Sequence, residues 1–291
     1  MKFAIHGRTF KKEVEPYIVQ LFNLLDKHAV DCQISAQLAE FLETTSLKNM
    51  SCRIYGEGQA PRDADFFISL GGDGTLLETV THVGASETPI IGVNTGRLGF
   101  LATTAPEQIE EMIKHLLHGY YQIDPRALIR VEADADLFGN TNFGLNDFTI
   151  TKRDTASMIT VHTYIDGEYL NSYWADGLIV ATPTGSTGYS LSCGGPVVLP
   201  QSNNFVISPV SPHNLTVRPL IVSDSSTISF TIEGRSHNFL VSLDSRSKVI
   251  DGSTQIAVRK EEFKAKLVKF REDYFLNTLR KKLNWGFDVR N

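Results

Sequence analysis

The chain lacks long apolar runs and has few cysteines, and these two scarcities exclude whole classes of protein. No stretch approaches the roughly 18 uninterrupted apolar residues of a membrane helix, and residues 1–8 lack the apolar centre of a signal peptide. The three cysteines, Cys32, Cys52 and Cys193, show no metal-ligand spacing, which favours a reduced protein over a disulfide scaffold. We therefore expect a cytoplasmic protein without a membrane partner.

Excess positive charge is also missing. The 28 lysines and arginines are outnumbered by 33 acidic residues, giving a formal net charge of −5, and no long basic stripe is present. Nucleic acid is therefore excluded as a partner, and small-molecule ligands are expected instead. With 291 residues, 42% of them hydrophobic, the chain is long enough for two domains that each bury a core.

The rest of the chain is organised around the turn GGDGT at residues 71–75, which lies between an apolar strand and a helix. Three glycines permit positive φ and let backbone N–H groups approach an anion at the helix N-terminus. This pattern predicts a phosphate site. Asp73 should repel phosphate unless a cation bridges the two or the carboxylate accepts a proton, which indicates chemistry. The alternative is a plain turn with Asp73 as the N-cap.

The first part of the chain alternates strands with helices. Its apolar spacing predicts strands at residues 2–5, 65–70 and 89–94, and helices at 14–29, 35–44 and 106–118. Two of the strands run into glycine-rich turns, at 71–75 and 95–101. In a parallel sheet both turns would lie at the carboxyl ends of the strands, where ligands bind. Residues 1–122 are therefore expected to form an α/β domain with a parallel sheet.

From residue 123 the pattern changes to short β-branched and aromatic runs separated by turn signals such as Asp166-Gly167 and Asp251-Gly252. Strands are predicted at 127–133, 148–151, 157–165, 241–243 and 263–270. Residues 123–268 should therefore form a mainly antiparallel, sandwich-like β domain. Residues 269–291 should form a C-terminal helix that packs back on the first domain.

Two stretches of the second domain carry polar groups suited to a nucleoside. Residues 176–192 combine Asp176, a strand and a loop rich in glycine and hydroxyl groups, in which Tyr189 offers a flat face. The alternative is a solvent-facing Ser/Thr turn. The pair Asn146-Asp147 stands at a strand entrance, and by itself it is a common turn sequence.

Taken together, the motifs at residues 71–75, 94–101, 146–147 and 176–196 resemble, in this order, those of NAD kinases. The resemblance covers about residues 66–220. It implies transfer of the γ-phosphoryl group of ATP to the 2′-hydroxyl of the adenosine ribose of NAD, giving NADP, with a divalent cation such as magnesium. It also implies an active site between the two domains, and a homo-oligomer, either dimer or tetramer.

The resemblance assigns roles residue by residue. Asp73 would accept the proton of the 2′-hydroxyl, and Gly71, Gly72 and Gly74 would admit phosphate to the backbone. The residues expected to bind the dinucleotide are Phe100, Asn146, Asp147, Asp176, Thr184, Thr187, Gly188, Tyr189, Ser190, Leu191 and Ser192. No metal ligands are assigned.

Two positions depart from the family pattern. Asp147 stands where the family usually has Glu, so its contact can shift or pass through water. Residues 244–246, Asp-Ser-Arg, stand where relatives often have Asp-Gly-Gln, and no function is carried over to them. A lipid or sugar kinase and a dinucleotide sensor without turnover are the competing hypotheses. The hydroxyl-rich loop opposes the first, and Asp73 opposes the second.

Overall fold

The structure is a computed structural model that describes residues 1–48, 52–56, 58–96, 99–153, 157–270 and 275–286. The chain divides into two compact units. Unit 1 comprises Met1–Pro125 and Ala265–Asn291, and unit 2 comprises Arg126–Lys264. In the described part of the chain, no helix is long and apolar enough to cross a membrane.

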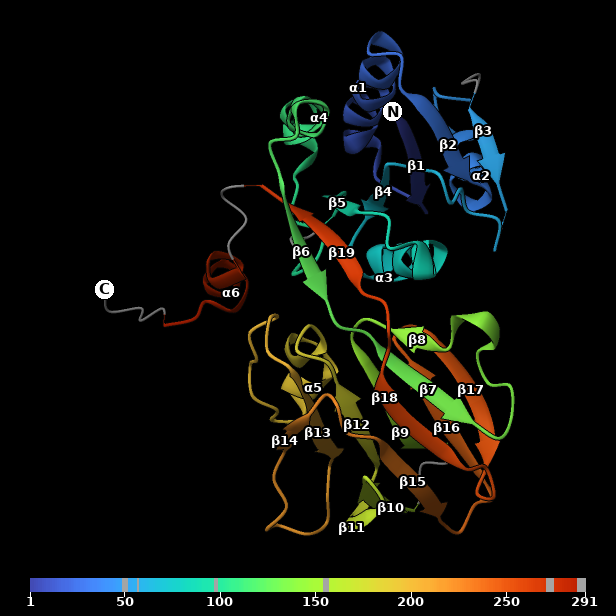
Figure 1. Cartoon of the computed structure of the whole chain (residues 1–291), viewed down its shortest axis with the longest axis vertical. Coiled ribbons are helices and arrows are strands. Elements are labelled where there is room, and N and C mark those ends of the chain that lie inside the picture. Colours follow the sequence, from blue (N-terminus) through green and yellow to red (C-terminus); the bar gives the residue numbers. More distant parts are fainter. Residues whose placement is uncertain (49–51, 57, 97–98, 154–156, 271–274, 287–291) are drawn as a thin grey trace. The chain divides into compact units, whose positions relative to one another are not determined.

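Unit 1 is an α/β structure whose described strands form one sheet in the order β3-β2-β1-β4-β5-β19-β6 (Figure 1). The pairs β2–β3, β1–β2, β1–β4, β4–β5 and β5–β19 are all parallel. The strands are β1 (Lys2–Gly7), β2 (Asp31–Ser35), β3 (Arg53–Tyr55), β4 (Phe66–Gly71), β5 (Ile90–Asn94), β6 (Gln122–Arg126) and β19 (Ala265–Lys269). The helices are α1 (Glu15–Lys27), α2 (Ala36–Leu42), α3 (Asp73–Val83), α4 (Ile109–His118) and α6 (Phe275–Leu283).

The alternation of side chains along β1 and β4 divides the sheet into two apolar faces. Phe3, Ile5 and Ile68 belong to a buried core to which α1 and α4 also contribute. The opposite face carries His6 and Gly92, and it meets α3. His6 Nε2 lies 3.3 Å from a carboxylate oxygen of Glu78 on α3. Helices thus cover both faces, as the predicted α/β architecture requires (Figure 1).

Several strands differ from the sequence prediction. β2 and β3 were not predicted, because Asp31–Ser35 is mostly polar and Arg53–Tyr55 has only three residues. Both form by parallel pairing at the β1 side of the sheet. The last predicted strand, at residues 263–270, was assigned to the β-rich domain. It forms β19, which instead pairs with β5 in unit 1 through Leu267 and Ile90.

Unit 2 contains two antiparallel sheets, in the orders β11-β10-β15-β18-β7-β8 and β14-β13-β12-β9-β16-β17 (Figure 1). Their apolar faces share one buried core that includes Phe148 and Phe239 from one sheet and Val161 and Phe230 from the other. The predicted β-sandwich is therefore confirmed. Its elements are β7 (Ile129–Ala133), β8 (Phe143–Gly144), β9 (Asp147–Lys152), β10 (Ile159–Ile165), β11 (Glu168–Ala175), β12 (Gly177–Ala181), α5 (Tyr189–Ser192), β13 (Asn204–Val210), β14 (Leu220–Ser223), β15 (Ile228–Glu233), β16 (Asn238–Leu243), β17 (Arg246–Asp251) and β18 (Ile256–Lys260).

Replacement of Gly92 should show how closely α3 and the following segment pack on the sheet. A Cβ at this position would lie 2.7 Å from the Cα of Ala102 and 2.9 Å from Cδ1 of Leu76. We expect Gly92→Ala to lower the free energy of unfolding by about 1–3 kcal/mol, as overpacking typically does. Gly74→Ala is the control, since nothing lies within 4 Å of its added Cβ. Urea unfolding measures both, and equal stabilities would contradict the close packing.

Candidate active site

The two glycine-rich turns of unit 1 lie next to each other at the carboxyl edge of its sheet. Gly71 and Asn94 are register partners at the ends of β4 and β5, and the N–H of Thr95 donates to the carbonyl of Gly71 at 3.3 Å. The strand order also changes direction between β1 and β4, which is where α/β sheets open a ligand crevice. This predicted neighbourhood is confirmed. Arg97 and Leu98 of the second turn lie outside the described residues.

Asp73 is the first residue of α3, and its carboxylate joins the two turns. Its Oδ2 accepts the N–H of Phe100 at 2.8 Å, and its Oδ1 accepts those of Leu101 and Ala102 at 3.0 and 3.1 Å. The N-cap of α3 is Gly72, which makes no side-chain cap. The plain N-cap alternative for Asp73 is therefore wrong, because its side chain holds a segment 27 to 29 residues away.

The glycines around Asp73 are needed because a side chain would not fit there or would cover the backbone, and not because the backbone adopts a positive φ. Gly72 has φ −93°, and none of the three predicted phosphate-site glycines has a positive φ, so that part of the expectation is wrong. A Cβ at Gly71 would lie 2.2 Å from the hydroxyl of Thr75, and one at Gly99 would lie 1.9 Å from Oδ1 of Asp73. By contrast, Gly72 and Gly74 have nothing within 4 Å of an added Cβ. The backbone at the α3 N-terminus is thus open to an anion.

In unit 2 a second carboxylate organises the predicted Asn146-Asp147 pair. Asp244 lies in the turn between β16 and β17 with φ +52°. Its carboxylate accepts the N–H groups of Leu145, Asn146 and Asp147 at 2.7, 2.7 and 3.2 Å. These three bonds fix the backbone on which both predicted binding side chains are mounted.

Burial dominates the electrostatics of this pair of acids. Desolvation raises the pKa of Asp244, against the opposing effects of its three N–H donors and of Arg246. Asp147 is 9% exposed, and its burial raises its pKa to about 7, with a further contribution from the negative charge of Asp244 and an opposing hydrogen bond from Thr149. Asp147 therefore changes protonation state near neutral pH.

The glycine-rich loop after β12 packs directly on the Asn146-Asp147 turn. Thr182 donates its N–H to the carbonyl of Asn146 at 2.8 Å and its hydroxyl to that of Leu145 at 2.5 Å. An added Cβ at Gly188 would lie 3.9 Å from Oδ2 of Asp147 and 4.0 Å from Nδ2 of Asn146. The structure therefore brings three predicted residues, Asn146, Asp147 and Gly188, to one place.

Two of the loop's hydroxyl groups are engaged inside the protein. Arg126 donates to Oγ1 of the buried Thr184 at 3.1 Å. The hydroxyl of Ser190, which is fully buried, pairs with that of Ser208 at 2.9 Å. These two hydrogen bonds hold the loop against its neighbouring residues.

The remaining predicted residues of the loop are at least partly exposed to solvent. Tyr189 is 45% exposed and Ser192 is also exposed, while Thr187 and Leu191 are partly buried. Partial burial raises the pKa of Tyr189, and nearby groups that include Asp176 and Asp147 raise it further.

Asp176 stands at the entrance to the loop and forms an ion pair. Its Oδ1 lies 2.6 Å from Nζ of Lys152, and both side chains are partly exposed. An exposed pair of this kind contributes little stability. Asp176 thus remains accessible to a ligand, in a position fixed by Lys152.

The sequence analysis assigned no role to two residues that build this site, Asp244 and Arg126. Asp244 ends an alternating apolar strand, and an acid in that context was the available signal. Arg126 directly precedes an apolar strand and is only 3% exposed, for which the sequence offers no comparable sign.

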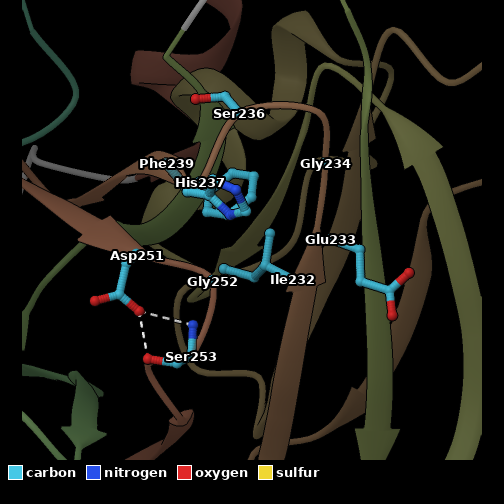
Figure 2. A pocket seen from close by; sticks show the side chains of 9 residues that line it. All are labelled: Ile232, Glu233, Gly234, Ser236, His237, Phe239, Asp251, Gly252 and Ser253. Carbon is cyan, nitrogen blue, oxygen red and sulfur yellow. Dashed lines mark hydrogen bonds between the residues drawn. The ribbon is translucent and has the colours of Figure 1, made fainter.

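Cavity size does not identify the site. A pocket of about 620 Å³ lies at one end of the sandwich and is lined by Glu233, His237, Asp251 and their neighbours (Figure 2). Asp251 in this pocket accepts hydrogen bonds from the N–H and hydroxyl of Ser253. None of the predicted site residues lines it.

A carboxylate fixed beside an open helix N-terminus in unit 1 and a hydroxyl-rich loop on the β-sandwich of unit 2 are each typical of nucleotide-dependent phosphotransferases. Comparison with known proteins supports this class. The family model of the ATP-NAD kinase N-terminal domain matches residues 7–121, and that of the C-terminal domain matches residues 145–270. The chain belongs to the ATP-NAD kinase family.

Individual relatives are similar to this protein over almost the whole length of the chain. The NAD kinase of Cytophaga hutchinsonii is 51% identical and that of Flavobacterium psychrophilum 42% identical, each with 100% of both chains covered. Among solved structures, an NAD kinase from Archaeoglobus fulgidus in complex with ATP has a TM-score of 0.73 at 28% identity, covering 97% of this chain and 98% of that one. Yeast NADH kinase complexed with NADH shares the fold, with a TM-score of 0.84 at 24% identity over 99% and 89% of the two chains.

The raised pKa of Asp147 predicts a pH-dependent stability. In the unfolded chain this group titrates near its ordinary value of 3.8, and in the folded protein near 7. Between these values the folded state binds more protons, so the free energy of unfolding falls as pH rises from about 4 to about 7. Asp147→Asn should flatten this decline, since each unit of pKa is worth about 1.4 kcal/mol.

Urea unfolding from pH 4.5 to 8.5 measures the effect. Asp26→Asn is the control, because Asp26 lies exposed on α1; it should keep the wild-type slope. A slope in Asp147→Asn equal to that of the wild type would show that Asp147 is ionised throughout this range.

Proposed function

We propose that this chain transfers the γ-phosphoryl group of ATP to the 2′-hydroxyl of the adenosine ribose of NAD, giving ADP and NADP. The observation that carries the proposal is the Asp73 carboxylate, fixed by three N–H groups at the open N-terminus of α3. Family membership supplies the substrates. Phosphoryl transfer depends chiefly on positioning and on neutralising charge, and this arrangement is suited to both.

The 2′-oxygen of NAD attacks the γ-phosphorus of ATP, and the bond from that phosphorus to the β–γ bridging oxygen breaks. ADP leaves with the electron pair, and the hydroxyl proton passes to Asp73. Backbone N–H groups at Gly72 and Gly74, where space is open, donate to phosphate oxygens.

Magnesium is proposed to arrive with ATP. Among the described residues, no group of three His, Cys, Asp or Glu side chains lies together in a way that could hold a metal. Mg²⁺ commonly binds through substrate phosphates, its own waters and one or two carboxylates. When bound, it supplies neutralisation of phosphate charge.

The dinucleotide is proposed to contact the exposed side of the unit 2 loop. Asn146, Asp147 and Asp176 offer polar groups, and Tyr189 offers its half-exposed ring. The other proposed contacts are Phe100, Thr187, Gly188, Leu191 and Ser192. Thr184 and Ser190 are proposed to support the loop through their buried hydrogen bonds.

The oligomeric state and the cellular location are proposed from the family resemblance and the cysteines. Family resemblance supports a homo-oligomer, either dimer or tetramer, acting on small-molecule nucleotides. The three cysteines form no disulfide, which is typical of cytoplasmic proteins. We therefore propose a cytoplasmic enzyme.

The direct test is incubation of the purified chain with ATP, Mg²⁺ and NAD, with NADP measured by an enzymatic cycling assay. Parallel reactions replace NAD with a sphingoid lipid or a sugar. ATP-dependent NADP formation is expected. Transfer to the lipid or the sugar alone would identify a different kinase, and NAD binding without any transfer would identify a sensor.

Replacement of Asp73 tests the proton acceptor. Asp73→Asn keeps one acceptor oxygen but replaces the other with an NH₂ group. That NH₂ group cannot accept a hydrogen bond from the backbone N–H that it faces. We expect kcat to fall by about 10² to 10⁴. The unfolding free energy should also fall by about 1–3 kcal/mol, because a buried donor loses its partner.

Measuring kcat well below the melting temperature separates the two effects. Asp63→Asn, at an exposed ion pair with Lys2, is the control and should keep wild-type turnover. A folded Asp73→Asn enzyme with near-normal kcat would remove Asp73 from the reaction.

Replacement of Asp176 tests the dinucleotide contact. Asp176→Ala should raise KM for NAD by about tenfold to a hundredfold, the scale of one lost hydrogen bond to a charged group, and leave KM for ATP nearly unchanged. Lys152→Met is the matched control, because it breaks the same ion pair but keeps the acid. Equal KM changes in both variants would show that Asp176 acts only through Lys152.

A further inference from the structure

Helix α6 is coloured dark red in Figure 1. Two of its side chains contact Phe100, in the turn that holds Asp73. The ring of Phe275 lies 6.4 Å from that of Phe100, centroid to centroid, and tilted by 39°. The Nζ of Lys282 lies 5.8 Å from the centroid of the same Phe100 ring. Both distances are within the range of attractive aromatic and cation–π contacts.

These contacts come from one face of the helix. Phe275, Leu279 and Lys282 are spaced i, i+4 and i+7, which places them in line along an α-helix. Leu279 is 7% exposed and Phe275 is partly buried, whereas Lys282 at the end of this face is exposed. Leu276 and Arg280 on the same helix are exposed.

Phe100 links this face to the proposed proton acceptor. Its backbone N–H donates to Oδ2 of Asp73, whereas Leu101 and Ala102 share Oδ1. Leu101 and Ala102 are buried, at 5% and 0% exposure, and are held by that burial. Phe100 is only partly buried, and its ring contacts Phe275 and Lys282 of α6.

We infer that Phe275 and Lys282 are positioning residues that hold Phe100, and through its N–H the Oδ2 of Asp73, in the geometry required for phosphoryl transfer. The helix acts as a brace for the turn. Its effect on the hydrogen bond is independent of any ligand, and its effect on turnover rests on the proposed function. A misplacement of a catalytic group by about 1 Å can cost a factor of about 10² in rate.

Amide hydrogen exchange tests the brace without relying on activity. In Phe275→Ala the amide of Phe100 should exchange about tenfold faster, the factor that corresponds to one hydrogen bond of ordinary strength. Leu276→Ala, on the exposed face, should leave the exchange unchanged. In Lys282→Met the rate should rise by about two- to fivefold, the scale of an exposed cation–π contact, and Lys281→Met is its control.

Lys282→Met also carries the test if Phe275→Ala fails to fold. Exchange at Phe100 equal to that of the wild type in Lys282→Met, and in any folded Phe275→Ala, would overturn the inference.

A double-mutant cycle connects the brace with turnover. Phe275→Ala should lower kcat/KM for NAD by about tenfold in the wild-type background and by less than about twofold in a Phe100→Ala background, because its effect passes through Phe100. Equal losses in both backgrounds would overturn the inference. A wild-type chain that makes no NADP would instead reject the proposed function, and the exchange result would still decide whether the brace exists.

Discussion

Each unit depends on a carboxylate that accepts the N–H groups of three consecutive residues. Asp73 does so with residues 100–102 in unit 1, and Asp244 with residues 145–147 in unit 2. A carboxylate has about four acceptor positions on two oxygens, which allows three neighbouring donors to converge on it. Such charge-assisted bonds are among the stronger hydrogen bonds in proteins. They therefore hold two segments of irregular backbone in place.

The two carboxylates differ in the groups that surround them. Asp73 is only partly buried and lies beside open backbone, so it can serve both as a tie and as a reactive group. Asp244 is also partly buried, and desolvation raises its pKa. Burial raises the pKa of its neighbour Asp147, and the negative charge of Asp244 raises it further. The burial of Asp147, with a smaller contribution from the Asp244 charge, therefore makes the stability of unit 2 depend on pH between about 4 and about 7.

The sequence predicted elements whose signals are local. The helix with Pro106 near its start and Gly119 after its end was correct to within a few residues, and so was the strand that enters the glycine turn. Pairings between distant segments could not be predicted. β19 joins β5 across most of the chain, and Asp244 contacts residues 97 to 99 positions away. Neither is encoded in the spacing of nearby residues.

The glycines of the motifs give a steric reason why the separate motifs occur together in one chain. Sequence reasoning attributed the glycines at 71, 72 and 74 to backbone freedom, but the tightest sites are Gly99 and Gly185. A Cβ at Gly99 would lie 1.9 Å from the Asp73 carboxylate, and one at Gly185 would lie 2.1 Å from the carbonyl of Asn146. In each case the obstructing oxygen belongs to a residue of another motif. A functional residue in one segment thus requires the absence of a side chain in another, which is a steric reason for the motifs to occur as a set.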